Sequence, residues 1–317
     1  MRLVTFRHKG IDSPGLLIDD DRVLDIRKAL SDGGPDGSGP FNGQAPANLL
    51  DIIIGGPSAL QVIRDCAADT GRTGGAVLPL TAVTLLAPIP RPLKNVFCVG
   101  SNYRAHVTEA SRAQAKEDKT PEHPVFFTKP PTSVVGPDAI IEFDPHISEK
   151  IDYEVELGVI IGKAGRDIPA ARAIDHIFGF TIINDITARD LQRRHGGQFL
   201  KGKGLDTSCP MGPEIVTLDA LPNFEDLRIS AQVNGEARQD GNTGDMIFPV
   251  ARLIESLSEG MTLEPGDLLA TGTPSGVGYA MTPPNFLGHD DVVTCEIEGI
   301  GKLENTVRDR TRAVSAA

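Results

Sequence analysis

The feature that most constrains the fold of this chain is a succession of short apolar runs that are seldom followed by a helical pattern. Beyond residue 94, two segments have helical spacing: residues 169–178, which begin with Pro169, and residues 249–260, with Gly260 in a capping position. A Rossmann fold or a TIM barrel would instead alternate strands and helices regularly. The pattern therefore predicts a β-rich α+β protein with an antiparallel or mixed sheet folded on itself. The predicted strands are residues 95–100, 125–129, 152–162, 179–185, 267–274, 291–301 and 302–308, together with a hairpin over 227–239 that turns at Asn234-Gly235.

The N-terminal part of the chain has a pattern of its own. Three short runs within residues 2–26 predict a small antiparallel meander. Residues 31–46 have the Gly- and Pro-rich composition of a loop. Residues 58–68 then predict a helix, with Gly71 as its stop.

The Pro-rich segment 85–94 predicts a domain boundary. A chain of 317 residues is long enough for two domains. We therefore expect a small, β-containing N-terminal domain over residues 1–90 and a larger domain over residues 91–317.

Composition excludes several classes of function. The chain has 31 Lys and Arg against 43 Asp and Glu, a formal net charge of −12, which disfavours general binding to nucleic acid or to an anionic membrane. No apolar run approaches the length of a membrane span, and the N-terminus lacks the apolar core of a signal peptide. The four cysteines follow no zinc spacing, so reduced, buried thiols in a cytoplasmic protein are expected.

Three acidic residues suggest a metal site. Glu154 and Glu156 are two apart on a predicted strand, so both side chains leave the same face. Such a pair costs repulsion unless a positive charge lies between them. Asp185 ends another predicted strand, and three carboxylates from two strands suit a hard cation such as Mg²⁺. The alternative is that all three are solvated acids on an exposed sheet face.

Two further segments are candidates for chemistry. His106 and Glu109 are three apart, and in a helix they would share a face, where the carboxylate fixes the imidazole as a general base requires; a plain surface pair is the alternative. Residues 187–204 hold five Lys or Arg against one Asp in an otherwise acidic chain, which suits a carboxylate ligand or a solvated basic loop. In residues 271–278, backbone amides and the Thr273 hydroxyl suit an anion or a simple tight loop.

Taken in order, these segments resemble the fumarylacetoacetate hydrolase family over residues 94–308. The resemblance implies a mixed β-sandwich roll, usually dimeric, with one divalent metal in a catalytic domain, here residues 91–317. It also implies that residues 1–90 are the family's variable cap domain. The stretches that carry the resemblance are CVGSNYRAH, PVFFTKPPTSVVGP, DYEVELGVIIGK, GFTIINDITARDLQ, KGKGLDTSCPMGP, VNGEARQDGNTGDMIF and LATGTPSGVG.

The resemblance also implies roles for individual residues. The implied metal ligands are Glu154, Glu156 and Asp185; the implied catalytic residues are His106, Glu109 and Lys203; and the implied substrate contacts are Lys129, Arg189, Gln192 and Thr273. Two positions depart from the family pattern. Ser101 replaces a basic or apolar residue, and Gly204 replaces a common Ser.

The function that this resemblance implies is hydrolysis of a C–C bond in an acylpyruvate-type 2,4-dioxo acid. Mg²⁺, with Mn²⁺ or Ca²⁺ as alternatives, would stabilise the departing pyruvate enolate. Oxaloacetate decarboxylation, or isomerisation or tautomerisation of a 2-hydroxy-dienoate, on the same metal site are the alternatives within enzymes. A metal-dependent carboxylate binder and a dimeric Ca²⁺ scaffold are the non-enzymatic alternatives. The expected partners are a small 2-oxo carboxylate and a second copy of the chain, in a catabolic role.

Overall fold

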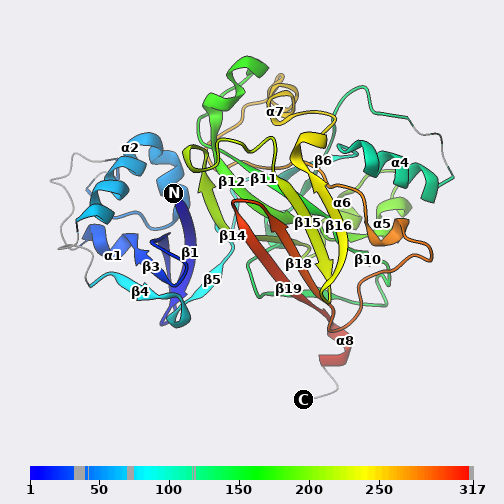
Figure 1. The fold of residues 1–317 in the computed structure, drawn as a ribbon, viewed down its shortest axis with the longest axis horizontal. Coiled ribbons are helices and arrows are strands. Elements are labelled where there is room, and N and C mark those ends of the chain that lie inside the picture. The colour runs from blue at the N-terminus through cyan, green and yellow to red at the C-terminus, as the bar shows by residue number, and fades with distance from the viewer. Residues whose placement is uncertain (32–39, 42, 70–74, 116, 118, 314–317) are drawn as a thin grey trace.

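The computed structural model describes residues 1–31, 40–41, 43–69, 75–115, 117 and 119–313 (Figure 1). Residues 32–39 and 42 of the predicted loop, and the predicted helix stop at Gly71, lie outside these ranges. The strands are β1 (Arg2–His8), β2 (Ile11–Leu17), β3 (Arg22–Asp25), β4 (Val77–Pro79), β5 (Thr84–Leu86), β6 (Val96–Gly100), β7 (Val125–Lys129), β8 (Val134–Val135), β9 (Ile140–Phe143), β10 (Ile151–Asp152), β11 (Val155–Ile161), β12 (Ile177–Asn184), β13 (Thr187–Ala188), β14 (Cys209–Thr217), β15 (Arg228–Val233), β16 (Glu236–Asn242), β17 (Leu268–Ala270), β18 (Val292–Ile297) and β19 (Gly301–Asp309).

Helices are fewer and mostly short. The α-helices are α1 (Ile26–Ser31), α2 (Leu49–Ala68), α4 (Arg104–Ala113), α5 (Arg189–Arg194), α6 (Leu200–Lys203), α7 (Val250–Ser258) and α8 (Arg310–Ala313). The 3-10 helices are η1 (Leu80–Ala82), η2 (Pro131–Ser133), η3 (Ala170–His176), η4 (Leu218–Ala220), η5 (Thr243–Asp245) and η6 (Gly278–Ala280). No helix of the described residues is both long enough and apolar enough to span a membrane.

Two mixed sheets form the body of the protein. Among the described residues, the larger sheet has 12 strands, ordered β4-β3-β2-β1-β14-β12-β11-β17-β6-β7, with β5 beside β1 and β8 beside β14. The smaller sheet has five strands, ordered β16-β15-β18-β19-β9. Most pairs are antiparallel, but β17 runs parallel to β6 and β9 parallel to β19. The predicted β-rich α+β fold with a mixed sheet is thus confirmed.

The two faces of β11 have different surroundings. Val155, Leu157 and Val159 lie in one core cluster with apolar residues of β15, β18 and α7, between the two sheets. Ile160 points to the opposite face and lies in a second cluster with residues of β1 and α2. Since side chains alternate along a strand, Glu156 lies on the same face as Ile160, near the start of β11. This end of the sheet is where the candidate site forms.

The N-terminal part extends the larger sheet. The predicted meander is present as β1, β2 and β3, and β1 pairs with β14 through Arg2 opposite Val216 and Leu3 opposite Ile215. In Figure 1 this part lies at the end of the molecule opposite α4 and α5. The second core cluster contains side chains from both sides of residue 90. The division into domains at that residue stays a prediction.

Two predicted helices differ from the structure. Residues 170–176 form a 3-10 helix, because only this short stretch separates Pro169 from the start of β12 at Ile177. The helix predicted at residues 58–68 is the second half of α2, which begins at Leu49 behind an Asn48 capping box and kinks at Gly56, where φ is +56°. The Gly-Gly-Pro sequence in its middle interrupts the helical pattern, so the sequence predicts only the second half of the helix.

Candidate metal centre and active site

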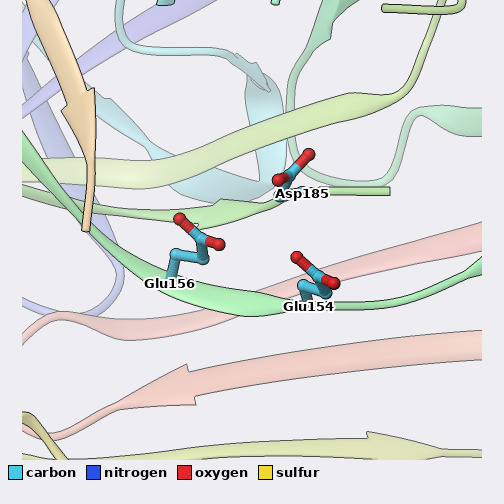
Figure 2. Close-up of side chains that lie close together, drawn as sticks. All are labelled: Glu154, Glu156 and Asp185. Atoms are coloured by element: carbon cyan, nitrogen blue, oxygen red, sulfur yellow. The ribbon is translucent and has the colours of Figure 1, made fainter. Parts of the chain in front are cut away.

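Three buried carboxylates converge beside the larger sheet. Ligand atoms of Glu154, Glu156 and Asp185 all lie within 4.8 Å of one another, and the residues are 4%, 1% and 0% exposed. Figure 2 shows two of these carboxylates leaving one strand and the third leaving its neighbour. The alternative of solvated acids on an exposed face is therefore wrong.

The pairing of β11 with β12 brings these acids together. Glu156 is opposite Ile183, and the Asp185 amide donates to the Glu154 carbonyl over 2.8 Å. The Asn184 side chain accepts a hydrogen bond from the Glu154 amide (3.1 Å), which fixes the chain where β12 ends. The apolar face of β11 is locked into the core, so its register sets the positions of the carboxylates.

Three cations surround two of the three carboxylates. The Lys203 ammonium lies 2.6 Å from both Glu154 Oε2 and Asp185 Oδ2. Lys129, which is 0% exposed, donates to Asp185 Oδ1 over 2.7 Å, and Arg189 Nη2 lies 2.7 Å from Glu154 Oε1. Burial disfavours the charged forms, but these ion pairs lower the pKa of Glu154 to about 2 and raise the pKa of Lys203.

Glu156 is different, because it is buried beside two acids without a cation of its own. Among the described residues, no Lys, Arg or His nitrogen lies within 4.0 Å of its carboxylate, which accepts one hydrogen bond, from Gly272 N (2.9 Å). Burial, followed by the charges of Asp185 and Glu154, raises its pKa well above the ordinary value. A buried carboxylate of this kind calls for a cation, so the donor set fits a hard divalent metal.

The predicted dyad forms on α4. His106 Nδ1 lies 2.9 Å from Glu109 Oε1, and His106 is 8% exposed. Glu109 is itself held by the Gly276 amide, which lies 2.9 Å from Oε2. The segment is helical, as the dyad requires, and the bond at Nδ1 leaves Nε2 as the nitrogen available to a ligand. A plain surface pair is thereby excluded.

One cavity of about 690 Å³ connects the dyad with the carboxylates. Asp185, Glu109 and Lys129 stand behind its wall, where they orient other residues. Its lining also includes Arg193, one of the basic residues of segment 187–204, and Tyr279, which the sequence did not single out. The predicted site residues that line it are His106, Glu154, Glu156, Arg189, Gln192, Lys203 and Thr273.

The Gly-rich segment 271–278 does bind anions, but they are carboxylates of the protein itself. Gly272 N donates to Glu156, Gly276 N to Glu109 and Gly278 N to Asp152. The Thr273 hydroxyl donates to the Val155 carbonyl and accepts from Gln239 Nε2. This segment therefore ties the dyad to the acidic cluster, and a contact between Thr273 and substrate stays a prediction.

The two departures from the family pattern have different surroundings. Ser101 lines the cavity with a left-handed backbone, φ +58°. Gly204 follows α6 in a crowded position, where a Cβ atom would meet the Leu200 carbonyl oxygen at 2.8 Å and Pro130 Cδ at 2.9 Å. A serine at position 204 would require this packing to shift.

Asp152 is a buried acid that sequence reasoning missed. It accepts hydrogen bonds from Arg189 Nε (2.8 Å), Gly278 N (2.8 Å) and Tyr279 N (3.1 Å), and it is 0% exposed. It thus fixes both Arg189 and the wall that carries Tyr279. The available signal was periodicity, because the acidic positions 154 and 156 continue in steps of two to residue 152.

We expect Asp152→Asn to lower the free energy of unfolding by about 3–5 kcal/mol, because it leaves the buried Arg189 without its full counter-charge. Urea denaturation measures the change. The control is Asp240→Asn, which breaks the exposed pair of Asp240 and Arg228 and should cost less than about 1 kcal/mol. Equal losses of unfolding free energy in the two variants would show that Asp152 contributes no more to stability than an exposed ion pair does.

The fold is a mixed β-sandwich, and its acidic cluster fits an enzyme that uses a divalent metal. Residues 95–308 match the family model described as "Fumarylacetoacetate (FAA) hydrolase C-terminal". The chain belongs to the fumarylacetoacetate hydrolase family.

Similar proteins carry several activities in their names. Oxaloacetate tautomerase YisK of Bacillus subtilis is 44% identical over 92% of this chain and 95% of its own length. The human mitochondrial oxaloacetate tautomerase FAHD2A is 40% identical over 97% of this chain and 91% of its own. The solved structure of a fumarylacetoacetate hydrolase from Exiguobacterium antarcticum has a TM-score of 0.79 and 39% identity, covering 98% of this chain and 100% of that one.

Proposed function

We propose that this protein interconverts the keto and enol forms of a small 2-oxo dicarboxylate of the oxaloacetate type, with Mg²⁺ as its metal. The observation that carries the proposal is that an oriented imidazole lines the same cavity as Glu154 and Glu156, two members of the buried three-carboxylate cluster. The names of the similar YisK and FAHD2A proteins support tautomerisation as the reaction. The acylpyruvate hydrolysis expected from the sequence becomes the second candidate.

Glu154, Glu156 and Asp185 would hold the metal. When bound there, Mg²⁺ would supply positive charge next to the substrate's carboxylate and 2-oxo oxygens, which makes the adjacent C–H more acidic and stabilises negative charge on oxygen. A tautomerase then needs a group that moves a proton between carbon and oxygen, and no attacking water.

His106 is the residue placed to move that proton. In the keto-to-enol direction, Nε2 takes a proton from C3, the C3–H electron pair forms the C2=C3 bond, and the carbonyl π pair moves onto the C2 oxygen. The imidazolium then returns the proton to that oxygen. Glu109 holds the ring through Nδ1 and so keeps Nε2 as the nitrogen that exchanges the proton.

Lys203 has a different part in this scheme. Its raised pKa, caused by Asp185 and Glu154, keeps it an ammonium, so it is a poor proton donor and cannot serve as the base. We assign it the task of bridging the Glu154 and Asp185 carboxylates and of adding positive charge beside the reacting oxygen.

Hydrolysis is the second candidate because the same His106 could take a proton from water instead of carbon. A solved maleylpyruvate hydrolase from Sphingobium has 28% identity and a TM-score of 0.72, covering 98% of this chain. Oxaloacetate decarboxylation would need neither the water nor the base. A simple carboxylate binder would have no use for the His106–Glu109 pair.

Comparison of substrates with Mg²⁺ present tests the proposal. The purified protein is given the enol form of oxaloacetate, and separately acetopyruvate, while enol absorbance and pyruvate release are followed together. We expect fast loss of enol absorbance from oxaloacetate without matching pyruvate, and no reaction after chelation with EDTA. Pyruvate and acetate from acetopyruvate would establish the hydrolase instead, and pyruvate with CO₂ from oxaloacetate would establish the decarboxylase.

The homodimer and the cytoplasmic location implied by the sequence remain proposals. Light scattering after size exclusion measures the mass of the assembly, for which a dimer is the expected result.

A further inference from the structure

Two arginines share one aromatic ring at the wall of the cavity. Tyr279 lies with its ring centroid 4.3 Å from the Arg189 guanidinium carbon and 5.4 Å from that of Arg193. Both arginines are on α5, four residues apart, so they project from the same helical face. Two like charges this close to one ring repel each other unless anions compensate them.

Only one of these two charges is compensated. Arg189 is buried and contacts both Asp152 and Glu154, at 2.8 Å and 2.7 Å. Arg193 is exposed, and among the described residues no carboxylate oxygen lies within 4.0 Å of its guanidinium. Lys203, the other cation that lines the cavity, is already paired with Glu154 and Asp185. Among the residues that the structure describes, Arg193 is therefore the cation lining this cavity that has no carboxylate partner.

We propose that Arg193 binds the distal carboxylate of the substrate and so selects 2-oxo dicarboxylates over 2-oxo monocarboxylates. This inference rests on the proposed function, because it takes the metal-side carboxylate and oxo group of the ligand to be bound at Glu154, Glu156 and Asp185. A planar guanidinium pairs with a carboxylate through two parallel hydrogen bonds. The contact with the Tyr279 ring orients that planar group beside the cavity.

The backbone of Tyr279 is held by a buried acid, which fixes the position of the ring. Tyr279 N donates to Asp152, the same carboxylate that holds Arg189, so the ring and the first arginine are fixed together. Arg193 contacts the same ring, and among the described residues it has no carboxylate partner within 4.0 Å. A substrate carboxylate would supply the missing anion, which relieves the repulsion between the two guanidinium groups.

The experiment compares oxaloacetate with its 4-methyl ester, which lacks only the distal charge. For the wild type, we expect both the affinity by calorimetry and kcat/KM to favour oxaloacetate by about 10- to 100-fold, the range for a charge-assisted hydrogen bond. In Arg193→Gln this preference should fall to near unity, while inhibition by oxalate, which lacks the distal group, stays unchanged. Arg193→Lys should retain part of the preference, since it keeps the charge without the planar fork.

Arg194→Gln is the matched control, because Arg194 is the next residue, is exposed and does not line the cavity. It should keep the full preference. A wild-type preference in Arg193→Gln would overturn the assignment. If the wild type exchanges no tautomer of either ligand, the proposed function fails, and the calorimetric preference still decides the role of Arg193 independently.

Discussion

Replacing His106 with alanine is expected to lower turnover about 10²- to 10⁴-fold, the usual contribution of a general acid or base. The affinity for Mg²⁺ should stay at its wild-type value, because His106 is hydrogen-bonded to Glu109 and not to any of the three clustered acids. Steady-state kinetics and calorimetric titration of the same preparation measure the two quantities. Together they separate loss of the base from loss of the metal.

Two further variants sharpen this test. Glu109→Gln should lower kcat more than it raises KM and should shift the pH profile of kcat, since Glu109 acts through the imidazole. His146→Ala removes an exposed histidine on another surface and should leave turnover unchanged. Wild-type turnover in His106→Ala would remove this residue from the mechanism.

Replacing Glu156 with glutamine is expected to weaken Mg²⁺ binding by at least about 100-fold. Changes to groups that merely support a metal ligand cost 10- to 100-fold, so loss of a direct ligand must reach the upper end of that range. Calorimetry with Mg²⁺ measures the effect. Tight binding in this variant would show that the acidic cluster is not the metal site.

In the metal-free protein, the same substitution should raise the stability of the fold relative to wild type as pH increases. In the folded chain the pKa of Glu156 is raised, so the folded state binds its proton more tightly than the unfolded state does. Glu156 therefore stabilises the fold below its ordinary pKa, and this contribution is lost as pH rises toward the folded-state pKa. Glutamine has no such dependence, so the stability of the variant relative to wild type should increase by up to about 1.4 kcal/mol per pH unit across that window.

Urea unfolding in EDTA at several pH values measures this difference. Glu149→Gln, which changes an exposed glutamate, should run parallel to the wild type. A flat difference between Glu156→Gln and wild type would mean that a cation already compensates this carboxylate in the folded chain.

Much of the candidate site could be predicted because it depends on the spacing of residues within one strand or one helix. Glu154 and Glu156 share a face by the two-residue period of a strand, and the dyad follows from the helical spacing of His106 and Glu109. Asp185 is joined to them by its place at the end of another predicted strand and by the family resemblance, but the pairing of β11 with β12 that brings the three together is a tertiary contact. The four cysteines, expected to be buried thiols, are buried in the structure and form no disulfide.

What the sequence concealed depends on long-range packing. Asp152, Arg193 and Tyr279 come from three elements, and their relation appears only when β10, α5 and η6 are brought to one wall of the cavity. The amides of residues 272–278 looked suited to a substrate anion, but they are used by the side chains of the protein. The length of helix α2 was underestimated because Gly56 and Pro57 interrupt its periodic pattern.

The pairing of β1 with β14 has a consequence for the integrity of the whole molecule. Strand β14 is also the neighbour of β12, which leads into Asp185, so the ladder is unbroken from the N-terminal meander to the acidic cluster. Removing residues 1–90 would take away β1, a partner of β14, and would leave an exposed apolar strand edge that is prone to aggregation. We therefore expect unfolding of the N-terminal strands to expose the edge of β14, which pairs with the strand that leads into Asp185.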